Sequence, residues 1–142
     1  MELPADMQFH EDIGLLIHRP HGVLNEAMVD KVISVIGELE AKQTKPFNRF
    51  WDTVEADEVD LNYRYVIHIS LYRRLATTGR PPVKSAVLAT DATIIHYAQV
   101  HAVMTQGSAI SVRVFQDRGR AAKWLGVPME RLQRLDKGKE VR

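Results

Sequence analysis

The hydrophobic and polar positions of the chain follow two patterns in alternation, one typical of strands and one typical of helices. Residues 7–19 alternate as an extended chain does, and Gly14 predicts a bulge or a turn between two short strands there. Apolar or alternating runs predict three further strands, at residues 47–53, 83–89 and 109–115.

Helices are predicted between and after these strands, at about residues 26–45, 60–78, 91–106 and 118–125. In the first helix, apolar residues three and four positions apart form one stripe, and Asn25 before it is a good N-cap. The expected N-caps of the last two helices are Thr90 or Asp91, and Asp117.

Residues 60–78 fit both patterns. Tyr63, Tyr65, Ile67, Ile69 and Leu71 alternate as in a strand, whereas a helical stripe is formed by Leu61, Tyr65, His68, Ile69, Tyr72 and Leu75. The length of the segment favours a helix, with Asp60 as its cap and with Arg73 and Arg74 suiting its C-terminus. This helix has too much apolar surface for one stripe. It is therefore either deeply buried or leaves an apolar patch for a partner or a lipid.

The order of these elements predicts an α/β fold, a mostly parallel four- to five-stranded sheet with helices packed on it. The first two strands are expected to form an antiparallel pair at one edge. The chain of 142 residues fits a single domain, which we assign to residues 1–128. A basic C-terminal tail, residues 129–142, follows and has room for one or two further turns through Leu132 and Leu135.

Composition narrows the functional classes. There are no cysteines, which excludes disulfides and thiolate metal sites and suits a cytoplasmic protein. No apolar run is long enough to span a membrane, and no secretory signal is expected at the N-terminus. A net charge of +1 indicates no particular partner, and without an interleaved aromatic and basic motif we do not expect nucleic-acid binding.

Motifs for catalysis or cofactor binding are missing from the sequence. The six histidines show no His-x-x-x-His or His-Glu-x-x-His spacing, and neither Gly-x-Ser-x-Gly nor Ser-x-x-Lys occurs. No glycine-rich loop joins a strand to a helix. We therefore expect no catalytic residue, no metal and no cofactor. The alternative is an enzyme that uses a carboxylate or histidine of the acidic segment 52–60.

The candidate binding surface lies at the carboxyl ends of the predicted parallel strands, where ligands and partners collect on such sheets. Two of these ends carry the pairs Asp52-Thr53 and Thr90-Asp91. The strongly apolar helix predicted at residues 60–78 begins soon after the first of these pairs. The candidate binding residues are Asp52, Thr53, Asp60, Leu61, Tyr65, Thr90 and Asp91.

Three motifs resemble the STAS fold and more closely its SpoIIAA-like branch, which is related to the lipid-binding Sec14 (CRAL-TRIO) domains, and the resemblance covers about residues 11–126. The first is the strand Phe50-Trp51-Asp52, which ends in an aspartate before an irregular loop. The second is Tyr72-Arg73-Arg74 before the apolar strand that ends at Asp91. The third is Val112-Arg113-Val114-Phe115 followed by Ala121-Ala122-Lys123-Trp124-Leu125.

The resemblance implies binding or regulation. Anti-anti-sigma factors of this fold are switched off by phosphorylation of a Ser or Thr in an Asp-Ser pair at the start of the second main helix. The matching pair here is Asp60-Leu61, and Leu61 has no hydroxyl. We therefore expect a non-enzymatic module that binds a lipid or another apolar small molecule, or a membrane surface. The alternative is a STAS-type regulator that contacts a protein partner. A homodimer is a further expectation.

Overall fold

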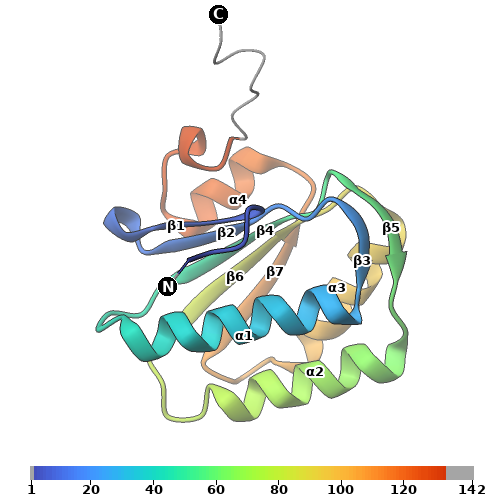
Figure 1. Cartoon of the computed structure of the whole chain (residues 1–142), viewed down its shortest axis with the longest axis horizontal. Coiled ribbons are helices and arrows are strands. Elements are labelled where there is room, and N and C mark those ends of the chain that lie inside the picture. The colour runs from blue at the N-terminus through green and yellow to red at the C-terminus, as the bar shows by residue number, and fades with distance from the viewer. Residues whose placement is uncertain (1, 134–142) are drawn as a thin grey trace, which may run out of the picture.

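A five-stranded sheet forms the centre of the molecule in the computed structural model, which describes residues 2–133 (Figure 1). The strand order is β1-β2-β4-β6-β7. These strands are β1 (Met7–His10), β2 (Leu15–His18), β4 (Asn48–Asp52), β6 (Val83–Leu88) and β7 (Ile110–Phe115). Strand β1 is antiparallel to β2, and the other neighbours are parallel. The predicted α/β fold with an antiparallel pair at one edge is confirmed.

Gly14 makes that antiparallel pair possible. It follows a short 3-10 helix, η1 (Glu11–Ile13), and has a φ of 58°, a left-handed conformation that favours glycine. Its carbonyl accepts a hydrogen bond from the amide of Asn48, so the turn is also tied to the start of β4.

Four helices are present in the described residues: α1 (Glu26–Lys42), α2 (Tyr63–Ala76), α3 (Ala92–Met104) and α4 (Arg118–Leu125). Asn25, Asp91 and Asp117 cap α1, α3 and α4, as predicted, because each side chain accepts a hydrogen bond from an amide of the first turn. The helical prediction for the ambiguous segment is confirmed too. Its cap is Asn62 and not Asp60, because the side chain of Asn62 accepts from the amide of Tyr65.

The acidic segment is not the irregular loop that the sequence indicates. Ala56–Asp60 forms a strand, β5, which pairs in parallel with a second unpredicted strand, β3 (Gly22–Asn25). Asp60 is the last residue of β5, three positions before the first residue of α2, so it lies too early in the chain to cap the helix. Neither strand has a long apolar pattern of its own. Their pairing joins segments far apart in the chain, which local periodicity does not reveal.

The inner face of α2 also differs from the predicted stripe. Its buried residues are Val66, Ser70 and Arg73, whereas Tyr72 and Leu75 are 53% and 74% exposed. Because apolar residues occur on every side of this helix, their pattern does not select one inner face.

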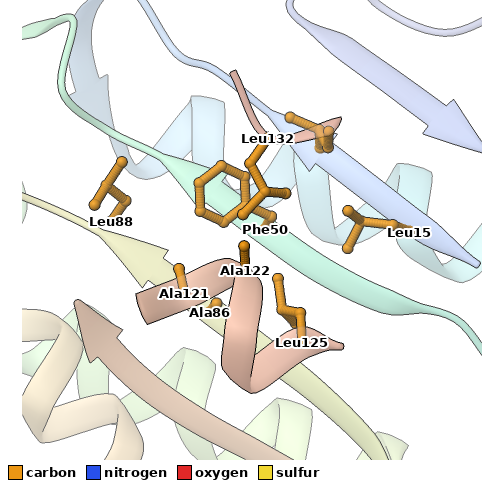
Figure 2. Close-up of a cluster of buried hydrophobic side chains, with 9 residues drawn as sticks. Leu15, Phe50, Ala86, Leu88, Ala121, Ala122, Leu125 and Leu132 are labelled. Carbon is orange, nitrogen blue, oxygen red and sulfur yellow. The ribbon is translucent and has the colours of Figure 1, made fainter. Parts of the chain in front are cut away.

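The core has two layers, one on each side of the sheet. On one side, Phe50 and Leu88 pack with Ala121 and Ala122 of α4 (Figure 2). Leu132, which the sequence assigns to the tail, joins this cluster and is fully buried, so the chain after α4 returns to the domain at this residue. Leu135 and the rest of the predicted tail lie outside the described residues.

Helices α1, α2 and α3 lie on the opposite side of the sheet from α4 (Figure 1). Helix α1 buries Val32, Val35, Ile36 and Leu39 against β2 and the segment before β4. Helix α2 packs mainly against α3, which in turn packs on β7. Within residues 2–133, no helix combines the length and apolar character needed to cross a bilayer.

Candidate ligand cavity

A cavity of about 130 Å³ lies between the three helices α1, α2 and α3 and the face of the sheet that they cover. Its wall is mostly aliphatic and aromatic, with Ile33 from α1, Ile69 from α2, Ile94 and Tyr97 from α3 and Val87 from β6. The cavity is partly open to solvent.

An apolar space of this size is unusual in a folded protein. Interiors are packed nearly as densely as organic crystals, and voids larger than a water molecule are few. Because this space opens to solvent, water reaches its apolar wall, and a ligand that displaces this water removes apolar surface from contact with it. An apolar cavity of about 150 Å³ is large enough to bind benzene.

The way α2 is attached explains why space is left behind it. At its N-terminal end, the hydroxyl of Tyr65 lies 2.5 Å from Oδ1 of Asp30 and 3.3 Å from the carbonyl oxygen of Glu26, which joins α2 to α1. Burial of the phenol, together with the hydrogen bond to Asp30, raises the pKa of Tyr65, so the hydroxyl stays a donor. In the middle of α2, Ser70 bonds to Nδ1 of His101 on α3 at 2.7 Å. These contacts fix the helix above the sheet without filling the space beneath it.

Besides the hydroxyl groups of Thr53, Tyr65, Ser85 and Tyr97, the cavity wall contains three residues of basic type. Arg49 comes from β4, Arg73 from α2 and His101 from α3. Strand alternation places Arg49 and Trp51 on the cavity side of β4 and Phe50 on the α4 side. Burial, followed by the nearby positive charge of Arg73, lowers the pKa of His101 to about 4, so this imidazole is neutral at physiological pH.

Three of the seven candidate binding residues line this cavity: Thr53, Leu61 and Tyr65. Thr53 is buried, and its hydroxyl donates to the carbonyl of Leu88 at 2.8 Å. The other four do not line it. Asp60, Thr90 and Asp91 are exposed, and the carboxylate of Asp91 is occupied by the amides of Thr93 and Ile94.

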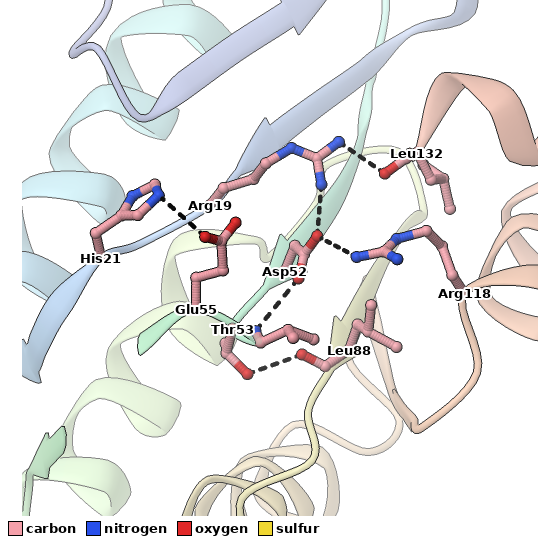
Figure 3. A network of polar contacts seen from close by, with 9 residues as sticks. Arg19, His21, Asp52, Thr53, Glu55, Leu88, Arg118 and Leu132 are labelled. Carbon is pink, nitrogen blue, oxygen red and sulfur yellow. Dashed lines mark hydrogen bonds and ion pairs between the residues drawn. The ribbon is translucent and has the colours of Figure 1, made fainter. Parts of the chain in front are cut away.

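Asp52 lies among arginines inside the protein (Figure 3). Its Oδ2 accepts from Arg19 at 2.5 Å and from Arg118 at 2.7 Å, while Arg19 also donates to the carbonyl of Leu132. The carboxylate is only 5% exposed. Asp52 therefore joins the end of β4 to the start of α4 and to the chain after it.

The sequence did not single out Arg49, Arg73 or His101 as site residues. The signal for Arg49 is its position inside a strongly aromatic strand segment, since an arginine is rarely buried without a reason. Arg73 lies on the same side of α2 as Val66 and Ser70, at helical spacing from them. It was missed because the apolar pattern of the sequence does not show that this side of the helix is the buried one. Among residues 2–133, no group of three or more His, Cys, Asp or Glu side chains is arranged to hold a metal ion.

Comparison with known proteins identifies a structural relative whose fold is informative. No protein-family model matches the chain, and no curated protein sequence matches it either. The structure is similar to the crystal structure of an uncharacterised protein of the DUF3478 family with a SpoIIAA-like fold from Shewanella loihica. The match has a TM-score of 0.53 at 16% sequence identity and covers 84% of this chain and 89% of that one. The resemblance seen in the sequence is confirmed at the level of architecture: the chain has a SpoIIAA-like fold.

Proposed function

We propose that this protein is a non-enzymatic module that binds an apolar small molecule in the cavity between α1, α2, α3 and the sheet. The observation behind this proposal is the cavity itself, an apolar space of about 130 Å³ that is partly open to solvent. A ligand that binds the folded protein in this space, and not the unfolded chain, stabilises the protein by mass action.

The size of the cavity limits the ligand. By comparison with a benzene-binding cavity of about 150 Å³, the space accepts a ring or a short alkyl chain. Each buried methylene contributes about 0.8 kcal/mol, so six supply about 5 kcal/mol before the entropic cost of binding. The neutral probe 1-octanol is therefore expected to bind weakly, with a dissociation constant of about 1 mM.

Filling the cavity with a side chain is expected to block this binding. Ala98 of α3 lines the cavity, and the ring of an Ala98→Phe variant occupies about the volume of a benzene molecule. We expect the affinity for 1-octanol, measured by NMR titration, to fall by about tenfold or more.

The matched control is Val103→Phe, at a position on the same helix that is 68% exposed. It adds an aromatic ring outside the cavity and is expected to leave the affinity unchanged. The proposal fails if the unaltered protein does not bind 1-octanol, or if both variants behave alike.

A second candidate, contact with a membrane surface, is supported by the outer face of α2. Tyr63, Ile67, Leu71 and Leu75 follow one another at intervals of four residues, and each is at least 39% exposed. Such spacing places them in one row on the helix, and a contiguous apolar row of this kind is typical of an interaction surface.

The double variant Leu71→Ser/Leu75→Ser is expected to reduce co-sedimentation with phosphatidylcholine–phosphatidylglycerol vesicles several-fold. Each leucine that enters the interfacial region contributes roughly 1–2 kcal/mol through burial of its side chain. The control is Val54→Ser, an exposed apolar residue in the turn between β4 and β5. If the unaltered protein does not co-sediment with vesicles, contact with a regulatory protein partner, as in the STAS-type alternative, becomes the better explanation of this row.

A further inference from the structure

Beside the cavity, three arginines share the carboxylate of Glu40, and two of them line the cavity wall. Arg49 Nη2 lies 2.6 Å from Oε2 of Glu40, and Arg73 Nη2 and Arg80 Nε each lie 4.0 Å from the same oxygen. Arg49 and Arg73 line the cavity with side chains 2% and 4% exposed, whereas Arg80 is half exposed and lies outside it. The cluster therefore has an excess of buried positive charge beside an apolar space.

Several donors of these two arginines are buried without a hydrogen bond. Nε and Nη1 of Arg49 and Nη2 of Arg73 find no hydrogen-bond partner within residues 2–133. The guanidinium of Arg49 does lie over the ring of Phe47, 4.6 Å from its centroid, which satisfies one face of the group but none of its N–H donors. Buried charged groups are ordinarily paired and fully hydrogen-bonded, because removing them from water is otherwise costly.

Within residues 2–133, Glu40 is the one carboxylate that forms an ion pair with Arg49 or Arg73. Burial, only partly offset by Glu40, lowers the pKa of Arg49 to about 10, and burial also lowers the pKa of Arg73. Both groups nevertheless remain cations at neutral pH. His101 beside Arg73 is neutral at that pH and does not balance the charge. An anionic group that enters from the cavity meets two buried arginines that share one carboxylate. Attraction between opposite charges is stronger in such a buried place than in water.

We propose that the ligand of this cavity is a carboxylate amphiphile, whose anionic end is bound by Arg49 and Arg73 while its short apolar part fills the space beneath α2. This inference rests on the proposed function. A guanidinium presents its N–H donors in a planar fork that matches a carboxylate, and such charge-assisted pairs are among the strongest hydrogen bonds in proteins. The apolar wall and the volume of about 130 Å³ limit the remainder of the ligand to a short chain or a ring.

The first test compares octanoate with 1-octanol in the unaltered protein at neutral pH, by NMR titration or calorimetry. The two probes have the same chain and differ in the end group, so octanoate is expected to bind at least about tenfold more tightly. Equal affinities, or tighter binding of the alcohol, would overturn the inference while leaving the proposed function intact. Failure of both probes to bind would instead remove the proposed function.

The second test removes one of the two cations. In an Arg73→Met variant, the affinity for octanoate is expected to fall by about tenfold or more, and the affinity for 1-octanol is expected to stay the same. The matched control is Arg64→Met, at an exposed arginine on the same helix, and this variant is expected to bind both probes as the unaltered protein does.

If Arg73→Met lowers the affinity for both probes equally, the assignment is contradicted, because the substitution then acts through the shape of the cavity and not through the charge. If Arg73→Met does not fold, the comparison of the two probes in the unaltered protein still decides the question.

Discussion

Replacing Asp52 by asparagine is expected to lower the free energy of unfolding by about 3 kcal/mol. The carboxylate is buried and accepts hydrogen bonds from Arg19 and Arg118, so the substitution removes the negative charge that joins these two side chains. Breaking a buried pair typically costs about 3–5 kcal/mol. We expect the lower end of that range, because the side chain of Arg118 is 31% exposed and can turn toward water.

Urea unfolding followed by circular dichroism measures this effect, with Asp57→Asn as the matched control. Asp57 is an exposed carboxylate in β5, and its substitution is expected to change stability by no more than about 0.5 kcal/mol. A similar small change for Asp52→Asn would show that the arginines do not depend on this carboxylate. Retained stability together with lost binding of 1-octanol would restore Asp52 as a ligand contact, which its position beneath α4 argues against.

Much of the fold is predictable because most of its elements have strong local signals. The strands β4, β6 and β7 are apolar or alternating runs, and the helices α1, α3 and α4 begin at side chains whose capping role depends only on nearby amides. The pair β3 and β5 has no such signal. Ala56–Asp60 contains three acids in five residues, and it becomes a strand because Gly22–Asn25 offers it backbone partners.

The candidate site was predictable in part, for a related reason. Thr53 was chosen because it follows a predicted strand, and Leu61 and Tyr65 because they lie at the start of the second helix. All three line the cavity. Strand position does not tell which side of the sheet a residue faces. Adjacent residues of β4 alternate, so Asp52 points to the α4 side while Trp51 lines the cavity. The buried role of Arg73 depends on how α2 is rotated over α3, which is set by tertiary contacts such as the one between Ser70 and His101.

His101 is expected to make the protein less stable in mild acid. Burial, followed by the charge of Arg73, lowers its pKa from the ordinary 6.5 to about 4. Between these two values the unfolded chain binds a proton that the folded protein does not, so stability falls as the pH falls from about 6.5 toward 4. Above that range the histidine is neutral in both states and contributes no pH dependence. The full depression corresponds to about 3 kcal/mol of unfolding free energy lost across the range.

The experiment is urea unfolding at a series of pH values, in the unaltered protein and in a His101→Gln variant. The glutamine side chain does not titrate and can still form a hydrogen bond with Ser70, so the stability of the variant is expected to change with pH by about 3 kcal/mol less than that of the unaltered protein. Burial also lowers the pKa values of His10 and His18, which leaves the variant with a residual pH dependence of stability of the same sign.

The control is His68→Gln on the exposed side of α2, which is expected to keep the full pH dependence of stability. Identical pH profiles for His101→Gln and the unaltered protein would mean that His101 is not held neutral in the folded state. The cavity wall would then contain a third cation beside Arg49 and Arg73 at pH values below about 6.5.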